Sequence, residues 1–212
     1  MNAEAQLQQG VAGLGLTLPA GAQGRLLQYL RLLSKWNRIY NLTAIREPSR
    51  LVSHHLLDSL AVVPHLEGAS LVDVGTGAGL PGIPLALARP EWTVTLLDSN
   101  HKKAAFLRQV VLELNLENIQ VVTERAEHWR ATALFDIAIS RAFSDLPGFV
   151  DTARHLCRPG GLLAAMKGIY PDEELAQLGP EIRVRKVVTL EVPGVRASRH
   201  LVVLQPENTG SG

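Results

Sequence analysis

The chain places glycines and acids in a spacing that suits ligand binding. Gly75, Gly77 and Gly79 alternate directly behind the apolar run Leu71–Val74, and Asp73 lies inside that run. A second apolar run, compatible with a helix, follows the glycines. Glycine adopts backbone conformations that other residues avoid and leaves no side chain in the way of a ligand. The pattern therefore predicts a buried strand, a loop and a helix start against which a ligand lies.

The spacing narrows the class of ligand. A dinucleotide loop needs glycine or alanine where this chain has Leu80, and a phosphate loop needs a Lys-Ser/Thr pair that is missing here. Asp98 ends the next apolar run, about 20 residues beyond the first glycine, where an acid can accept both hydroxyls of a ribose. This combination favours an adenosyl ligand without phosphate, of which S-adenosylmethionine is the obvious one. The alternative is a tight strand-to-helix turn with a surface aspartate.

Further candidates follow the carboxyl ends of the strands, where ligands of doubly wound sheets bind. Asp73 could receive the ammonium of the cofactor, and bonding to loop N–H groups is an equal alternative. Arg141 interrupts an apolar strand end, and because arginine is rarely buried without a partner, we expect a functional cation. Glu127 could lie beside the adenine of the cofactor or serve only as a favourable charge at a helix start. The remaining candidates for cofactor contact are Thr76, Leu80, Ser99 and Ala126.

Two signatures of other methylation chemistries are missing. Methylation at carbon 5 of a pyrimidine needs a thiolate, but the single Cys157 is expected late in a helix as a small core residue. Methylation of exocyclic amines in related enzymes uses Asn/Asp-Pro-Pro-Tyr/Phe after the fourth strand, where this chain has Ser140-Arg-Ala-Phe. The remaining good target is the lone pair of a ring nitrogen. Such a target needs in-line positioning rather than a nucleophile or a base.

Length and composition limit the class of protein. A chain of 212 residues with 46% apolar residues fits one globular domain with a small extension. It has neither a stretch of 18 uncharged apolar residues nor a basic-then-apolar N-terminus, so we expect a cytoplasmic protein outside the membrane. One cysteine excludes internal disulfides and Cys-cluster metal sites, and no metal is expected. A net charge of +1 does not by itself indicate nucleic acid.

The N-terminal third reads as helical. Residues 1–19 are weakly patterned and suggest a short helix, whereas helical spacing predicts helices over 21–36 and from Pro48 to Val63. Six Lys/Arg and one acid lie between Arg25 and Arg50. This basic strip is either a solvated helix face or, with Trp36 and Tyr40, a surface for RNA phosphates and bases. Both interpretations remain open.

After Gly68 the pattern changes to alternating strands and helices. The strands are continuous apolar runs, which is typical of a parallel sheet covered on both faces, so we predict a doubly wound α/β fold. The last two strand-like segments, with a short loop at Pro193-Gly194, predict a hairpin at the sheet edge. The expected strands are 70–74, 93–98, 119–123, 136–140, 161–166, 183–192 and 200–205, and the expected helices are 82–89, 101–115 and 145–157.

Ordered motifs over roughly Leu26–Leu204 resemble one family, the bacterial small-subunit (16S) ribosomal RNA guanine-N7 methyltransferases, also known as glucose-inhibited division protein B. The first is the loop Asp73-Val-Gly-Thr-Gly-Ala-Gly-Leu-Pro-Gly-Ile-Pro84. Ala78 departs from the family, which usually has proline there. The other matching strings begin at Lys35, His54, Leu97, Phe106, Ile139, Met166 and Ser198.

The resemblance implies a fold, a reaction and site residues. The fold would be the mostly parallel seven-stranded, Rossmann-like sheet of class I methyltransferases at 68–206, with a helical extension at 1–67 and a disordered tail at 207–212. The enzyme would be a monomer that binds 16S ribosomal RNA or the small-subunit particle. Arg141, beside the cofactor carboxylate, would act in catalysis with Lys167 and Arg199. Candidates for holding RNA are Asn41, His55, Asp58, Arg125, Lys167 and Arg199, although His55 is more readily a structural histidine paired with Asp58.

Three rival functions have different requirements. A small-molecule methyltransferase would need an apolar pocket in the N-terminal helices rather than a basic strip. A nicotinamide oxidoreductase is disfavoured by Leu80. A protein that only binds RNA would have a defective cofactor site.

Overall fold

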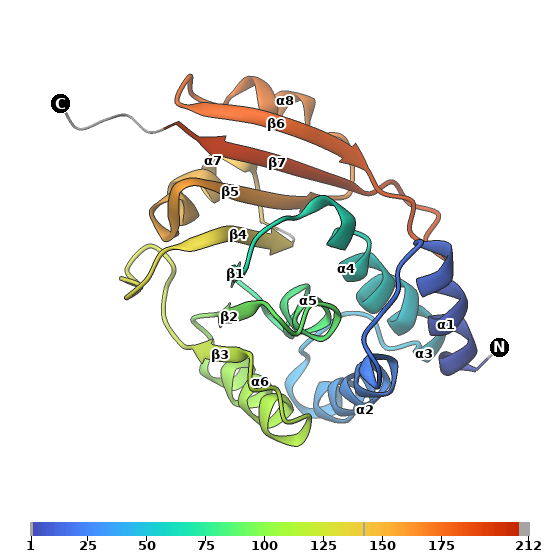
Figure 1. The fold of residues 1–212 in the computed structure, drawn as a ribbon. Helices are drawn as coiled ribbons and strands as arrows, with labels where there is room; N and C mark the ends of the chain where they lie inside the picture. Colours follow the sequence, from blue (N-terminus) through green and yellow to red (C-terminus); the bar gives the residue numbers. More distant parts are fainter. Residues whose placement is uncertain (1, 142, 208–212) are drawn as a thin grey trace.

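The computed structural model describes residues 2–141 and 143–207, so positions 208–212 of the expected tail lie outside the described residues. Seven strands form one sheet in the order β3-β2-β1-β4-β5-β7-β6. The first five are parallel, and β7 runs antiparallel to β5 and β6 (Figure 1). The strand order reverses between β1 and β4, the position at which such sheets bind ligands. The predicted doubly wound fold is confirmed.

The parallel strands lie where the apolar runs predict them, within one to four residues. Their bounds are β1 Ser70–Val74, β2 Thr93–Leu97, β3 Ile119–Val122, β4 Phe135–Arg141 and β5 Cys157–Lys167. The helices that connect or flank them are α5 Gly82–Ala88, α6 His101–Glu113, α7 Leu146–Ala153, the 3-10 turn η3 Arg154–Leu156 and α8 Asp172–Ala176.

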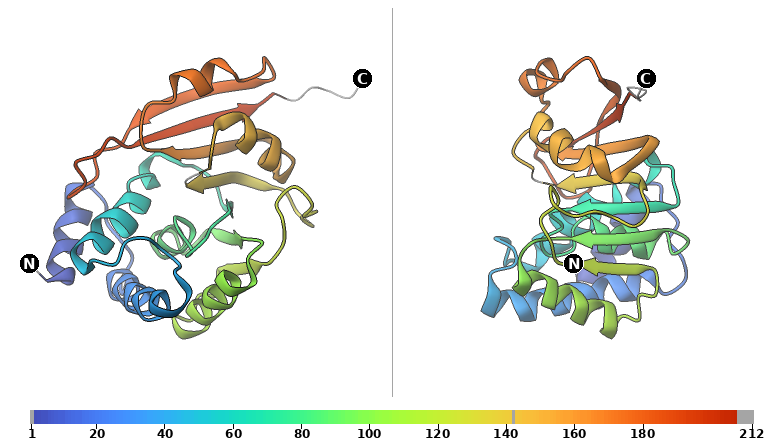
Figure 2. Two further views of the ribbon diagram at one scale, coloured as in Figure 1. Left: turned by 180° about the vertical axis from the view of Figure 1, so that it is seen from behind. Right: turned by 90° about the vertical axis from the view of Figure 1, so that its left-hand side faces the viewer.

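Apolar side chains cover both faces of the sheet. Along β4, Ile137 and Ile139 point into a core shared with α5, α6 and the N-terminal helices, whereas Ala138 joins a second core under α7. This alternation follows from the strand geometry, in which successive side chains point to opposite faces. Figure 2 shows the helices on either side of the strands. The polar ends of the strands are therefore the part of the sheet that remains for a ligand.

The N-terminal extension is helical and packs into the first core. It comprises α1 Ala3–Gly13, α2 Ala22–Tyr40, α3 Pro48–Leu51, the π-helix η1 Val52–Leu57, α4 Asp58–Leu60 and the 3-10 turn η2 Val63–His65. The predicted helix over Pro48–Val63 thus contains a π-helical segment and ends at Leu60. π-Helical turns are rare and frequently occur at functional sites. Here the segment carries His54 and His55.

Two predicted boundaries are wrong. Cys157 was expected late in a helix, but α7 ends at Ala153 and Cys157 is the first residue of β5, where it pairs with Phe135. The Arg-Pro-Gly-Gly string after it is an irregular start of that strand rather than a helix stop: the register shifts so that Ile137 pairs with Leu162. Gly160 supports the irregularity with a φ of 78°.

The C-terminal hairpin has a longer loop than predicted. It consists of β6 Ile182–Thr189 and β7 His200–Pro206, so residues 190–199 form the connection. The N–H of Leu190 donates to the carbonyl of Arg199 at 2.7 Å and closes the ladder. The apolar side chains of Leu190 and Val192 predict a strand at these positions. Instead they are buried in the core that includes the N-terminal helices.

Candidate active site

The glycine loop after β1 has two kinds of glycine. Gly75, Gly77 and Gly79 all have positive φ values, of 67°, 61° and 92°. A Cβ added to Gly75 would meet nothing within 4 Å, and one on Gly77 would meet only atoms at 3.9 Å or more. A Cβ on Gly79 would instead collide with the side chains of Ile83 and Leu107. The first two glycines therefore expose backbone, whereas the third is required by packing.

Asp73 lies fully buried beneath this loop. Its Oδ2 accepts the hydroxyl of Thr76 at 2.6 Å and the N–H of Gly82 at 2.8 Å, so the expected bonding to loop groups is present. Burial raises the pKa of Asp73 to about 6 against these two hydrogen bonds. Its Oδ1 is buried without a hydrogen-bond partner among the described residues. An unsatisfied carboxylate oxygen is costly, and a ligand ammonium would satisfy it.

Asp98 follows β2 and is also buried. Its Oδ2 accepts the N–H of Gly77 at 2.9 Å and lies 3.6 Å from Nζ of Lys103, while its Oδ1 accepts the N–H of Asn100 at 2.8 Å. The acid thus holds the open part of the glycine loop against the end of the neighbouring strand. Each carboxylate oxygen keeps a further lone pair for a ribose hydroxyl.

A cavity of about 170 Å³ joins Gly75 and Asp98 to the predicted adenine edge. Among the predicted cofactor residues it is lined by Gly75, Asp98, Ser99, Ala126 and Glu127, and Arg125 and Phe143 lie on it as well. Leu80 is different, because its side chain is buried in the core. An exposed glycine backbone, an unpaired buried oxygen and a carboxylate at the strand end together fit S-adenosylmethionine.

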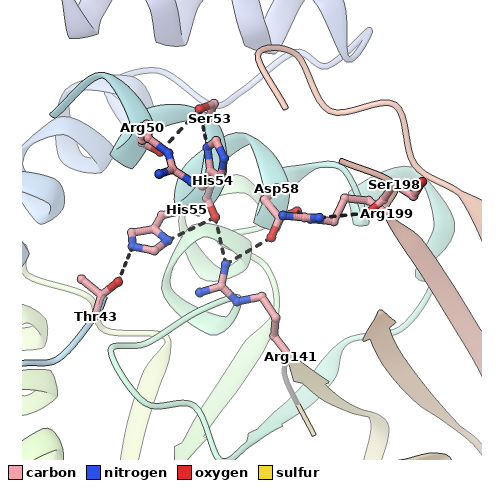
Figure 3. Close-up of polar contacts among 9 residues, drawn as sticks. All are labelled: Thr43, Arg50, Ser53, His54, His55, Asp58, Arg141, Ser198 and Arg199. Carbon is pink, nitrogen blue, oxygen red and sulfur yellow. Dashed lines mark hydrogen bonds and ion pairs between the residues drawn. The ribbon is translucent and has the colours of Figure 1, made fainter. Parts of the chain in front are cut away.

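Asp58 joins two arginines at the next strand ends (Figure 3). Nη1 of Arg141 donates to Oδ2 of Asp58 at 3.1 Å and to the carbonyl of His54 at 3.0 Å. Nε of Arg199 donates to Oδ1 of Asp58 at 2.8 Å. Asp58 is 3% exposed, and each of its two carboxylate oxygens accepts a hydrogen bond from one arginine. The arginine side chains are each 23% exposed, and they line a cavity of about 430 Å³.

His55 is held by groups other than the expected Asp58. Its Nε2 lies 2.9 Å from the Thr43 hydroxyl, and its Nδ1 lies 3.1 Å from the carbonyl of His54 (Figure 3). Burial and the nearby Arg141 lower the pKa of His55 to about 4, so the ring is neutral at neutral pH. The suggested pairing with Asp58 is wrong, because the arginines occupy that carboxylate. The histidine instead fastens the segment after α2 to the π-helix.

Lys167 ends β5 and lines the same cavity. Its Nζ forms an ion pair with Oε2 of Glu174 at 2.8 Å and reaches the carbonyls of Phe143 and Ser144 at 3.3 and 3.4 Å. Oε2 of Glu174 also accepts the N–H of Leu146 at 2.7 Å. The lysine is therefore tied to the loop between β4 and α7.

The remaining RNA candidates lie on the surface. Asn41 directly follows α2 with a φ of 50°, and its Oδ1 accepts a hydrogen bond from Nη2 of Arg46 at 2.9 Å. Arg125 is exposed at the cofactor cavity. In the basic strip, Arg38 and Arg46 line a cavity of about 280 Å³ beside Thr43. This part of the strip therefore borders a cavity. Thr43 and Ile45 line both this cavity and the cavity of Arg141 and Arg199, here called the arginine cavity.

Cys157 lies away from these groups. It pairs with the first residue of β4, whereas Arg141 is the last, and seven residues of strand span about 20 Å. Burial raises the pKa of its thiol to about 12. A neutral thiol at the opposite end of the strands does not serve as a nucleophile.

Sequence reasoning did not single out four residues that hold the site together. The hydroxyl of the fully buried Tyr29 donates to the carbonyl of Ala78 at 2.8 Å and ties α2 to the glycine loop. Oδ1 of Asn37 accepts the N–H of Thr43 at 2.9 Å. Glu174 and Thr43 act as described above. Such polar groups in apolar helices or short loops give no spacing signal, although Asn37 and Thr43 lie inside one of the family-like strings.

The sheet order, the exposed glycine backbone after β1 and the acid after β2 define the class of S-adenosylmethionine-dependent methyltransferases. Solved structures share the fold. Cofactor-bound Rv0187 from MTB matches with a TM-score of 0.63 at 18% identity, over 87% of this chain and 91% of that chain. A methyltransferase from Geobacter sulfurreducens in complex with S-adenosyl-L-homocysteine matches with 0.55 at 14% identity, over 84% and 98%.

The chain belongs to the GidB family, described as rRNA small subunit methyltransferase G, whose model matches residues 22–202. Two relatives called ribosomal RNA small subunit methyltransferase G support this assignment. The one from Nitrosospira multiformis is 57% identical over 97% of this chain and 98% of its own length. The one from Laribacter hongkongensis is 53% identical over 96% and 99%. The resemblance of the motifs is thereby confirmed.

Within residues 2–141 and 143–207, the helices are too short or too polar to span a membrane.

Proposed function

We propose that the chain methylates N7 of a guanine in 16S ribosomal RNA by direct transfer from S-adenosylmethionine. The observation that supports it is the cavity of about 430 Å³ at the carboxyl ends of β4 and β5 and the start of β7. Three cationic side chains line it, namely Arg141, Lys167 and Arg199. Cations around a concave site suit the phosphates on either side of a nucleotide that enters it.

We assign the cofactor to the groups around the glycine loop. Oδ1 of Asp73 would accept the ammonium of the methionine moiety, and Asp98 would accept the ribose hydroxyls. Gly75 and Gly77 would present backbone to the ligand, while Thr76 and Gly79 keep the loop in shape. Ser99, Ala126 and Glu127 would border the adenine, and Leu80 would act through packing.

Arg141 and Arg199 fit the anionic groups of the two substrates. Arg141 ends β4, and its charge acts on the buried Asp73 beneath the loop. Within the described residues, Asp58 and His54 take up only its Nη1, so its other N–H groups suit the cofactor carboxylate. Arg199 and Lys167 suit RNA phosphates. Asp58, whose oxygens are both bound, would position the arginines rather than touch RNA. Asn41, His55 and Arg125 would shape the rim of the cavity around the bound RNA.

The reaction asks for placement rather than proton transfer. When bound, S-adenosylmethionine supplies a methyl group on a positively charged sulfur. The N7–C bond forms as the C–S bond breaks, no proton leaves, and the positive charge passes to the purine. Because the product ring is cationic, Lys167 and Arg199 are better placed at RNA phosphates, and Arg141 at the cofactor carboxylate, than over the base. The protein therefore holds the methyl donor and N7 in line and places its charges around the transferring group.

We further propose that residues 1–67 form an RNA-facing extension of the catalytic domain at 68–206, and that the enzyme acts as a monomer in the cytoplasm. The basic strip supports this assignment, as does Thr43, which lines both the cavity of the strip and the arginine cavity. Either naked RNA or the assembled small subunit would then be the substrate.

Mapping of methylated nucleosides tests the function. Mass spectrometry of 16S ribosomal RNA from cells with and without this protein should show one 7-methylguanosine that depends on it. Adding the purified protein and S-adenosylmethionine to RNA or small subunits from deficient cells should restore that modification. An unchanged set of methylated guanosines in the deficient cells would contradict the proposal.

A further inference from the structure

Two neighbouring apolar side chains project from the loop after β5. Ile169 is 79% exposed and Tyr170 is 47% exposed. A large aliphatic side chain that is exposed to this extent loses the free energy that burial would provide. Such exposure next to a polar cavity is typical of a binding surface rather than of a core.

The loop that carries them is fastened at both ends. Lys167 before it is ion-paired with Glu174, and Pro171 after it is buried. The ring of Tyr170 also meets the ring of His200 edge-on, with centroids 5.5 Å apart and an interplanar angle of 85°. The two apolar side chains therefore extend from an anchored segment, and the tyrosine ring has a defined orientation.

The loop borders the arginine cavity. Lys167 and Gly168 line that cavity, as does His200, the residue against which Tyr170 packs. His200 is 8% exposed, and its Nδ1 is buried without a hydrogen-bond partner within the described part of the chain. An aromatic ring, an exposed isoleucine, several cations and an unsatisfied imidazole nitrogen thus gather at one rim.

We propose that Ile169 and Tyr170 form a stacking shelf for a nucleobase of the RNA next to the methylated guanine. This inference rests on the proposed RNA substrate and adds where the neighbouring nucleotide lies. Bases of single-stranded RNA stack on aromatic side chains, while cations hold the adjoining phosphates. Tyr170 offers the ring, Ile169 an apolar edge, and Lys167 with Arg199 the charge. The edge-on contact with His200 fixes the orientation of the Tyr170 ring.

Affinity for 16S ribosomal RNA of matched variants, measured with S-adenosylhomocysteine present, tests the shelf. Tyr170→Ala should weaken RNA binding about 5- to 160-fold, the effect of losing one stacked base. Tyr170→Phe keeps the ring and should bind like the parent. Leu112→Ala removes a side chain that is 76% exposed on α6, away from the cavity, and should change nothing. Affinity for S-adenosylhomocysteine should be equal in all four proteins, which excludes a folding defect.

A direct contact should also be visible. Ultraviolet cross-linking of the parent to 16S ribosomal RNA, followed by tryptic digestion, should attach a nucleotide to the peptide 168–183, in which Tyr170 is the single aromatic residue. RNA binding by Tyr170→Ala that equals the parent, or a digest in which this peptide carries no nucleotide, would overturn the shelf. If the parent itself neither binds nor methylates the RNA, the proposed function fails instead.

Discussion

Asp98 holds the glycine loop in place and also offers lone pairs at the strand end, so its removal should affect ligand binding before stability. We predict that Asp98→Ala weakens binding of S-adenosylhomocysteine by about 1.5–3 kcal/mol, the range for hydrogen bonds to a charged group. Calorimetric titration measures this, and circular dichroism should show an intact fold. Unchanged affinity would remove Asp98 from the cofactor site.

Asp73 should give cofactor binding a dependence on pH. Its pKa is raised to about 6, so the carboxyl is ionised above that pH and becomes protonated below it. Since an ammonium binds the ionised form, affinity for S-adenosylhomocysteine should be constant from pH 7 to 8 and fall by up to about tenfold per pH unit below 6. Asp98→Ala should bind more weakly, and its bend should lie at a lower pH, because the charge of Asp98 contributes to the raised pKa of Asp73. A constant affinity between pH 5 and 8 would contradict the assignment of the ammonium to Asp73.

At the scale of elements, Asp58 connects α4 with the end of β4 and the start of β7 through two ion pairs. Asp58→Asn leaves Arg141 and Arg199 without their shared anion. We expect a loss of about 1–3 kcal/mol in unfolding free energy, below the range for fully buried pairs because the arginines are partly exposed. We also expect weaker binding of RNA, because the guanidinium groups are no longer held.

Asp136→Asn is the matched control for this change. Asp136 pairs with Arg158 and accepts the N–H groups of Ala69 and Ser70 at the opposite end of the strands. Denaturant titration should therefore also show a loss of stability, while RNA affinity stays at the parental level. Equal RNA affinity in Asp58→Asn and the parent would show that Asp58 does not position the arginines.

Sequence patterns located elements better than links between them. The strands were predictable because apolar runs and glycines with positive φ leave clear local signals. The ion pairs of Asp58 were not, since they join residues 58, 141 and 199 across three elements and depend on tertiary packing. The same holds for Tyr29, whose hydroxyl reaches Ala78 from within an apolar helix face. Cys157 was misplaced because Pro-Gly-Gly is typical of a helix stop, whereas here it forms an irregular strand start.

For the whole molecule, a net charge of +1 means that RNA affinity rests on local clusters. Arg38 and Arg46 line one cavity of the basic strip. Helix α2, which carries Arg38, lies on the opposite side of the molecule from β6 (Figure 1). Each cation that contacts a single-stranded phosphate should add about 0.7 to the slope of log affinity against log salt. We predict that replacing both arginines by glutamine lowers this slope and leaves the affinity for S-adenosylhomocysteine unchanged.

The control for the salt experiment is Arg183→Gln with Arg185→Gln, two exposed cations on β6. This pair changes net charge by the same amount at a distant edge and should keep the parental slope. An RNA affinity of the parent that is independent of salt would favour a small-molecule substrate. Equal slopes in both double variants would assign the basic strip to a solvated surface.

The central claim is direct transfer to N7 of a guanine, and RNA with 7-deazaguanine at the target nucleotide tests it most directly. The replaced atom is carbon, so the RNA should bind with near-parental affinity and accept no methyl group in a single-turnover assay with S-adenosylmethionine. The unmodified RNA should be methylated at a rate that is flat across neutral pH, because no base titrates. Methyl transfer to the deaza nucleotide would contradict the account.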